Sequence, residues 1–122
     1  MRLVIGGRGQ GKKTYVHGLG YDWEEMKPCL SEQPVVVSLE DIVARLLKDG
    51  QDPLAVVLRH ADAHPDAVYV CTEMGCGVVP VDRFQREWRE AAGRVCCALA
   101  AKASRVERIF CGLPMVLKEE EA

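Results

Sequence analysis

A glycine-rich segment near the start of the chain combines residue types that bind phosphate. It follows a short apolar run and contains a G-x-x-x-x-G-K pattern over residues 6–12. Glycines let consecutive backbone N–H groups converge on phosphate oxygens, and a lysine neutralises phosphate charge. We predict an anion-binding turn in which nucleotide phosphates contact Gly6, Gly7, Arg8, Gly9, Gln10, Gly11, Lys12, Lys13 and Thr14. A purely structural glycine turn is the alternative.

Lys13 departs from this pattern, which has Ser or Thr directly after the lysine, where the hydroxyl binds Mg²⁺. Thr14 comes one residue late, and one step turns a helical side chain by about 100°. Phosphate binding is therefore expected to survive, whereas Mg²⁺-dependent transfer is expected to be weakened. In a bolder alternative, Lys13 acts as a point charge in place of the metal.

A second candidate cluster follows the apolar run at residues 67–72. Glu73 stands at the end of this predicted strand, and Gly75 and Gly77 form a small glycine loop before a predicted helix. Ligands of open parallel sheets bind outside the carboxyl ends of the strands. Substrate chemistry is therefore expected at these residues, with a glycine turn and a solvated glutamate as the alternative.

The histidines and cysteines give no comparable pattern. His60 and His64 have the i, i+4 spacing of metal ligands, but no third ligand is signalled and Pro65 ends the helix, so we predict a solvated helix end and no metal site. A metal site there, or His17 as a nucleophile, is the alternative. No C-x-x-C pair occurs, and reduced thiols in or near the core are predicted for Cys29, Cys71, Cys76, Cys96, Cys97 and Cys111.

Alternating apolar runs and helical patterns define the elements that must position these residues. Strands are predicted at residues 2–5, 35–37, 67–72 and 106–111, and their continuous apolar character suits a sheet covered on both faces. Helices are predicted at residues 38–48, from Pro53 onward, and at residues 80–104. Together they predict an α/β domain with a mostly parallel sheet.

Smaller signals mark the ends of these elements. Ser38 and Asp41 fit a capping box at the start of the first of these helices. Residues 18–33 show no clean period and are predicted to be a connection. Residues 118–121 are predicted to be a solvated tail.

Length, charge and composition limit the number of domains and the kinds of partner that are expected. At 122 residues, one domain spanning residues 1–122 is expected. Sixteen Lys and Arg against 18 Asp and Glu give a formal net charge of −2, which argues against nucleic acid as the main partner. No apolar run is long enough for a membrane span or a signal peptide, so no membrane partner and a cytoplasmic location are expected.

The second cluster resembles the adenosylcobinamide kinase/adenosylcobinamide-phosphate guanylyltransferase family of cobalamin biosynthesis. That family has Thr-Asn-Glu-Val-Gly-x-Gly-Ile-Val-Pro, and residues 72–80 read Thr-Glu-Met-Gly-Cys-Gly-Val-Val-Pro. The following helix is similar in its arginines and in Gly-Arg-Val at residues 93–95, and the closing Gly-x-Pro-x-x-x-Lys resembles residues 112–118. The opening Gly-Gly-Ala-Arg-Ser-Gly-Lys-Ser is similar to residues 6–13.

The resemblance implies a three-layer P-loop NTPase-like α/β domain with about four or five strands. It implies ATP or GTP in the glycine-rich turn, cobinamide as acceptor, and a homo-oligomer, usually a trimer. Lys12 and Glu73 would be the catalytic residues, with Gly75, Gly77 and Arg83 as further substrate-binding candidates.

One part of the family pattern is missing. Family members are longer between the glycine-rich turn and the middle strand, where the histidine that accepts GMP lies. We therefore expect a shortened cobinamide kinase-like protein without guanylyl transfer. The alternatives are a degenerate relative that binds nucleotide or corrinoid, or acts as a partner subunit, without turnover, and an unrelated small-molecule P-loop kinase.

Overall fold

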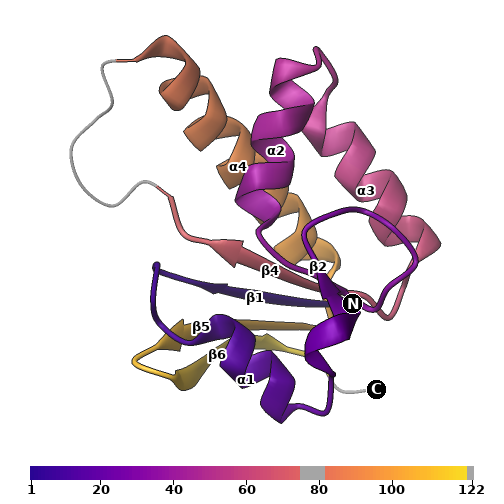
Figure 1. Ribbon diagram of the computed structural model, residues 1–122, viewed down its shortest axis with the longest axis vertical. Helices are drawn as coiled ribbons and strands as arrows, with labels where there is room; N and C mark the ends of the chain where they lie inside the picture. Colours follow the sequence, from indigo (N-terminus) through magenta and orange to yellow (C-terminus); the bar gives the residue numbers. More distant parts are fainter. Residues whose placement is uncertain (75–81, 121–122) are drawn as a thin grey trace.

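A six-stranded sheet forms the centre of the structure, a computed structural model that describes residues 1–74 and 82–120. The strand order is β2-β3-β4-β1-β5-β6, and all neighbours pair in parallel except β5 and β6, which are antiparallel (Figure 1). The bounds are Arg2–Gly6 (β1), Met26–Lys27 (β2), Val35–Val36 (β3), Val68–Thr72 (β4), Arg105–Phe110 (β5) and Leu113–Glu119 (β6). The predicted α/β class is confirmed, but the described residues form six strands rather than four or five.

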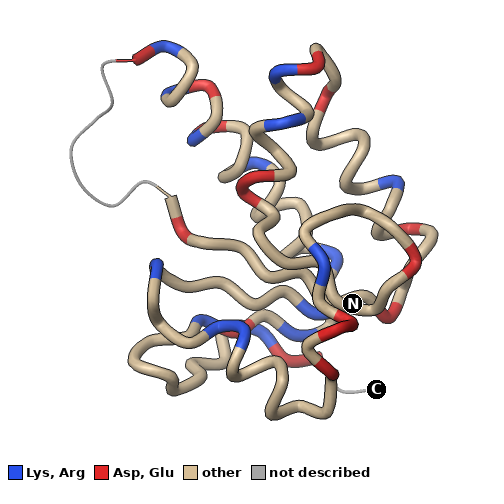
Figure 2. The backbone as a smooth tube through the Cα atoms, in the orientation of Figure 1, with Lys and Arg blue, Asp and Glu red and all other residues tan. Residues whose placement is uncertain are grey.

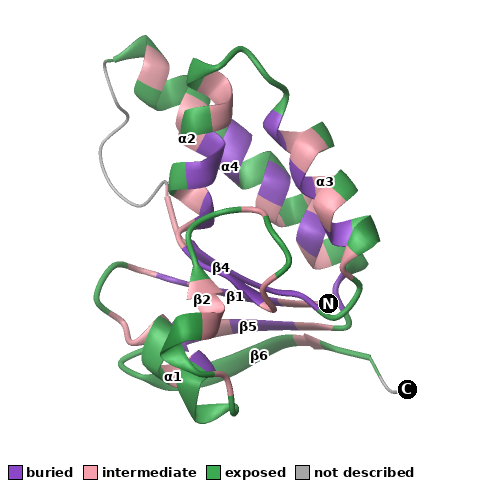
Figure 3. Cartoon of the chain, turned by 45° about the vertical axis from the view of Figure 1, so that its right-hand side comes forward, coloured by how far each residue is buried: buried purple, intermediate pink, exposed green. Residues whose placement is uncertain are grey.

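Helices cover both faces of this sheet. Their bounds are Lys12–Gly18 (α1), Leu39–Lys48 (α2), Pro53–Ala63 (α3) and Arg83–Lys102 (α4), with a 3-10 helix at Trp23–Glu25. α2, α3 and α4 lie together on one face and α1 lies on the other (Figure 1). One apolar cluster fills each side, and Figure 3 shows the buried positions on the sides of α2, α3 and α4 that face the sheet. The continuous apolar strands follow from this double cover.

The two strands missing from the prediction lie at the edges of the sheet. β2 occupies two residues of the predicted connection, which is too short to leave a period in the sequence. β6 contains Lys118 and Glu119, so the predicted tail at 118–121 is wrong for these residues. Cys111 and Gly112 have φ values of 53° and 76°, and this mirror-image turn folds β6 back along β5.

The helix predicted at residues 80–104 is present as α4, which carries a buried apolar stripe of Ala91, Ala92, Val95 and Leu99. The helix begins at Arg83, where Oδ1 of Asp82 accepts a hydrogen bond from the Phe84 amide at 2.8 Å. The predicted start at residue 80 lies outside the described residues. The stripe holds α4 against the sheet, where the helix contacts β1.

The start of α2 corrects the predicted capping box. Ser38 has φ 54° and ψ 44°, in the left-handed region, and its side chain makes no capping hydrogen bond. β3 ends only two residues earlier, so the chain must turn sharply into the helix, and Asp41 is left exposed. This turn brings the first residues of α2 to the carboxyl edge of the sheet.

Charged residues of both signs lie along the helices and the outer strands (Figure 2). Within residues 1–74 and 82–120, every helix falls short of the length and apolar character needed to cross a membrane.

Candidate functional site

The glycine-rich turn links β1 to α1 at the carboxyl edge of the sheet. Gly9 and Gly11 have φ values of 74° and 88°, in the left-handed region that favours glycine. At Gly6, a Cβ atom would lie 2.7 Å from the carbonyl oxygen of Ile109 in β5. Three glycines of the motif are therefore required by the path of the backbone.

Gln10 ties this turn to the β5–β6 turn. Its carbonyl oxygen accepts a hydrogen bond from the Gly112 amide at 2.8 Å, and its Oε1 accepts one from the Cys111 amide at 2.7 Å. A cavity of about 570 Å³, here called the outer cavity, is lined by Gly9, Gln10, Gly11, Thr14, Tyr15, Gly18, Leu19, Cys111 and Gly112. The glycine-rich turn is thus braced from the side of β5.

Lys12 folds back over the turn. Its Nζ donates a hydrogen bond to the Gly7 carbonyl oxygen at 2.7 Å. Burial lowers the pKa of the Lys12 ammonium, while the nearby carboxylates of Glu40 and Glu73 act to raise it. Carboxylates from α2 and from the segment after β4 therefore both act on this lysine.

Glu40, in the first turn of α2, reaches the same place from the other side. Its Oε1 accepts a hydrogen bond from the Thr72 amide at 2.9 Å, where β4 ends. A cavity of about 260 Å³, here called the turn cavity, is lined by Gly9, Gln10, Gly11, Lys12, Lys13, Thr14, Ser38, Glu40, Val70 and Thr72. The sequence reasoning missed Glu40 as a site residue, because it lies three positions beyond the predicted strand at 35–37 and inside the predicted helix.

Glu73 forms a two-point ion pair with Arg108 of β5. The Arg108 Nε lies 2.9 Å from one carboxylate oxygen of Glu73, and Nη2 donates to the other at 3.1 Å. Such paired contacts are among the stronger ion pairs because both donors fit both oxygens. Arg108 is a further site residue that the sequence reasoning missed, since it lies inside an apolar strand.

A third cavity lies between β4 and α4. This β4–α4 cavity has a volume of about 320 Å³ and is lined by Ile5, Cys71, Thr72, Glu73, Met74, Ala92, Gly93, Cys96 and Arg108. It is mostly apolar apart from the Glu73–Arg108 pair. Thr72 lines both this cavity and the turn cavity, so both spaces border the end of β4.

Residues 35–117 match the family described as cobinamide kinase / cobinamide phosphate guanyltransferase. The chain belongs to this family. The match runs from β3 into β6 and includes Glu40, Glu73 and Arg108, and it begins after the glycine-rich turn. No curated protein matches the chain.

In this cobinamide kinase / guanyltransferase family member, only some of the predicted phosphate-binding residues line the turn cavity. Lys12, Lys13 and Thr14 line one cavity, so the one-residue delay of Thr14 does not remove it from the turn. Gly6, Gly7 and Arg8 are absent from the lining of that cavity, and Arg8 is exposed.

The predicted substrate-binding residues are less complete. Arg83 is exposed and pairs with Glu87 at 3.0 Å, one turn further along α4. It does not line the β4–α4 cavity. Gly75 and Gly77 lie outside the described residues. Among the predicted substrate-binding residues that the structure describes, Glu73 lines the β4–α4 cavity and Arg83 does not.

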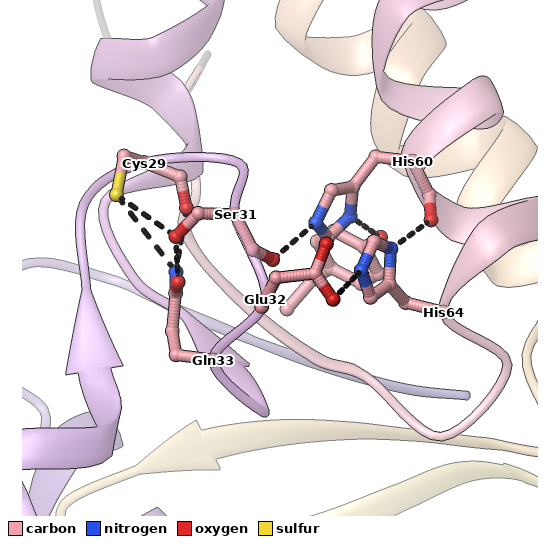
Figure 4. Close-up of polar contacts among 7 residues, drawn as sticks. Cys29, Ser31, Glu32, Gln33, His60 and His64 are labelled. Atoms are coloured by element: carbon pink, nitrogen blue, oxygen red, sulfur yellow. Dashed lines mark hydrogen bonds and ion pairs between the residues drawn. The ribbon is translucent and has the colours of Figure 1, made fainter.

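Two histidines of this family member, His60 and His64, contact the segment at residues 31–32 (Figure 4). His60 hydrogen-bonds through Nδ1 to the Tyr69 hydroxyl at 2.6 Å and through Nε2 to the Ser31 carbonyl oxygen at 2.9 Å. His64 stacks on His60 and lies 3.4 Å from the Glu32 carboxylate. The predicted solvated helix end is therefore wrong for His60, because Tyr69 of the sheet core holds it. His17 bonds to the Tyr21 carbonyl oxygen.

No cluster of three or more His, Cys, Asp or Glu residues in the described ranges could hold a metal ion.

The cysteines of the described ranges divide into two groups. Cys71 is buried and Cys96 is half-buried, as predicted for thiols in or near the core. Cys29, Cys97 and Cys111 are exposed, so the core prediction is wrong for them. Cys97 follows Cys96 on α4 and therefore points away from the buried stripe.

Proposed function

We propose that the chain binds ATP or GTP and transfers a phosphoryl group from it to cobinamide. Membership of the family supports a role in cobalamin biosynthesis. The observation that carries the proposal is that two cavities share Thr72 in their linings. One is lined by lysines and glycines, and the other is mostly apolar with one ion pair.

In this proposal, the nucleotide phosphates enter the turn cavity. Backbone N–H groups of the glycine-rich turn and the Lys12 ammonium would bind the phosphate oxygens, since lysine carries a compact charge suited to them. The Thr14 hydroxyl and the Glu40 carboxylate line the same cavity and are the oxygen ligands that Mg²⁺ prefers. When bound, Mg²⁺ would neutralise charge on the phosphates.

The acceptor would approach from the β4–α4 cavity. Its hydroxyl oxygen forms a bond to the terminal phosphorus, the bond to the bridging oxygen breaks, and the nucleoside diphosphate leaves. Glu73 is the proposed base that takes the hydroxyl proton. For this step the carboxylate must exchange at least one of its contacts with Arg108 for the acceptor.

A second candidate function, binding without turnover, rests on that same ion pair. Both oxygens of Glu73 are engaged by Arg108, and Lys13 replaces the hydroxyl that usually binds the metal. A protein with these two features could hold a nucleotide or corrinoid as a partner subunit without catalysing transfer.

We also propose that the chain forms a homo-oligomer, a trimer by its family resemblance. Exposed apolar side chains lie on β6 and at the end of β5, namely Leu113, Met115, Val116 and Leu117 of β6 and Phe110 of β5. An apolar surface of this kind suits contact with another copy.

The central test incubates the purified protein with cobinamide and ATP or GTP and measures cobinamide phosphate by liquid chromatography and mass spectrometry. The Lys12→Met variant is expected to lose nucleotide affinity by about tenfold or more, because a charged contact to phosphate is removed. Lys27→Met, at an exposed lysine of β2, is the control. Nucleotide binding without any product would select the binding-only function.

A second variant tests the acceptor cavity. Gly93 lines this cavity from α4, and an added Cβ meets no atom within 4 Å. Gly93→Leu should therefore fill the cavity without disturbing the helix, abolishing phosphorylation while preserving nucleotide affinity. Ala101→Leu, at an exposed position of the same helix, should retain activity. Full activity of Gly93→Leu would rule out this cavity as the acceptor site.

A further inference from the structure

Two cysteine side chains line the β4–α4 cavity from opposite sides. Cys71 lies in β4 with 2% of its surface exposed, and Cys96 lies in α4 and is half-buried. Cys71 belongs to the apolar core cluster, and Cys96 packs against the same cluster. Packing of α4 on the sheet therefore places at one cavity two thiols that are separated by 25 positions in the sequence.

The two thiols have unequal chemistry. They are hydrogen-bond partners, and this bond lowers the pKa of the Cys96 thiol. The same bond, together with burial, raises the pKa of the Cys71 thiol. The Thr72 carbonyl oxygen is a second acceptor for the Cys71 proton, at 3.5 Å. Cys96, the more accessible of the two, is therefore the better nucleophile.

We propose that Cys71 and Cys96 form a reversible disulfide in response to hydroperoxides. A nucleophilic, accessible thiol beside a second, resolving thiol is the arrangement found in redox-sensing pairs. Neither thiol has a role in the proposed phosphoryl transfer, so this site is additional to it.

The reaction balances with one peroxide. The Cys96 thiolate attacks the peroxide, the O–O bond breaks, and an alcohol or water leaves after protonation, giving a sulfenic acid on Cys96. The Cys71 sulfur then attacks the Cys96 sulfur, the S–O bond breaks, and water leaves with the Cys71 proton. The two thiols lose two electrons and two protons, and the peroxide is reduced. A thiol reductant restores both thiols.

The cross-link would join β4 to α4 at the wall of the β4–α4 cavity, one residue from Thr72 and two from Glu73. If the proposed function holds, on which this consequence rests, oxidation should reduce cobinamide binding reversibly. Nucleotide binding should change little, because neither cysteine lines the turn cavity.

The test treats the reduced full-length protein with one equivalent of hydrogen peroxide, blocks the remaining thiols, and maps the peptides without reduction. We expect one predominant cross-linked peptide, joining Cys71 to Cys96, with the loss of two hydrogen atoms, and its disappearance after reduction. Cys97→Ser, at the exposed neighbouring thiol, should form the same cross-link, whereas Cys96→Ser should lose it. Free Cys71 and Cys96 in an oxidised protein, or a cross-link between other cysteines, would overturn the proposal.

A second measurement guards against misfolding of a core variant. In Cys71→Ala, oxidation should stop at the sulfenic acid of Cys96, which dimedone labels selectively. Circular dichroism checks that this variant folds. Absence of dimedone label on Cys96 in the folded variant would also count against the pair. If the cross-link forms but the protein does not bind cobinamide, the disulfide proposal stands. The proposed phosphoryl transfer to cobinamide is then contradicted.

Discussion

At the scale of single residues, the turn cavity sets Lys12 and Lys13 against the carboxylate of Glu40. The charge of Lys13 adds to burial in lowering the pKa of Lys12. A divalent cation entering this cavity would therefore meet two positive charges and one carboxylate. Replacement of Lys13 should therefore change the Mg²⁺ dependence of nucleotide binding most.

Lys13→Ser should raise nucleotide affinity in the presence of Mg²⁺ by about fivefold, since it removes a repelling charge and supplies a metal-binding hydroxyl. Calorimetric titration of ATP and GTP, with and without Mg²⁺, measures this change. Lys13→Ala is the matched control, because it removes the charge without adding the hydroxyl. Equal affinities of the original protein and the Ser variant under both conditions would contradict this account.

The contacts of the three histidines lead to a second prediction at this scale. The turn cavity is not lined by His17, His60 or His64. Each of these histidines has a hydrogen-bond or ion-pair partner outside that cavity. Incubation with GTP and cobinamide phosphate should therefore leave the intact mass of the protein unchanged. A stable increase by one GMP group, measured by intact-mass spectrometry, would identify a histidine acceptor and reverse this expectation.

At the scale of elements, β5 contributes a buried charge to the face covered by α1. Glu107 is fully buried, with Nη1 of Arg2 and Nε of Arg105 each 3.3 Å from its carboxylate. The Tyr15 hydroxyl of α1 donates a hydrogen bond to the same carboxylate. Burial raises the pKa of Tyr15, so its hydroxyl keeps its proton at neutral pH and can donate.

Glu107→Ala should lower the free energy of unfolding by about 3 kcal/mol, because it leaves two partly buried guanidinium groups without their shared carboxylate. Urea denaturation at neutral pH measures the change. Glu119→Ala removes an exposed partner of Arg105 and should lower the free energy by no more than about 1 kcal/mol. Similar losses of unfolding free energy in the two variants would show that the buried ion pairs of Glu107 contribute little to stability.

Local signals and long-range contacts explain what the sequence could predict. The glycine-rich turn and the stripe of α4 were predictable because left-handed φ values and helical periodicity depend on neighbouring residues. Glu40 bonds to an amide 32 residues away, and Arg108 bonds to Glu73 across 35 residues. Only the packing of α2 on the sheet and the pairing of the strands bring these residues together, so no local pattern marks them as site residues. β6 escaped prediction because its apolar residues lie outside the core.

At the scale of the whole molecule, the proposed oligomer makes the β6 edge its interface. Leu113 and Leu117 are 69% and 57% exposed there. Size-exclusion chromatography with light scattering should give a multiple of the 13.5 kDa chain mass, whereas Leu117→Asp should shift the protein toward a single chain. Ala101→Asp, on exposed α4, serves as control. A single-chain mass for the original protein would refute this assembly.

Gln10 gives the glycine-rich turn and the β5–β6 hairpin a shared set of hydrogen bonds. A nucleotide that restrained the turn would also restrain the hairpin, and a copy packed on β6 would restrain the turn in return. By thermodynamic linkage the two binding free energies must change by the same amount. Assembly would then sharpen the response to nucleotide, and Gln10, which lines the turn cavity and also bonds to the hairpin, would set the strength of that cooperativity.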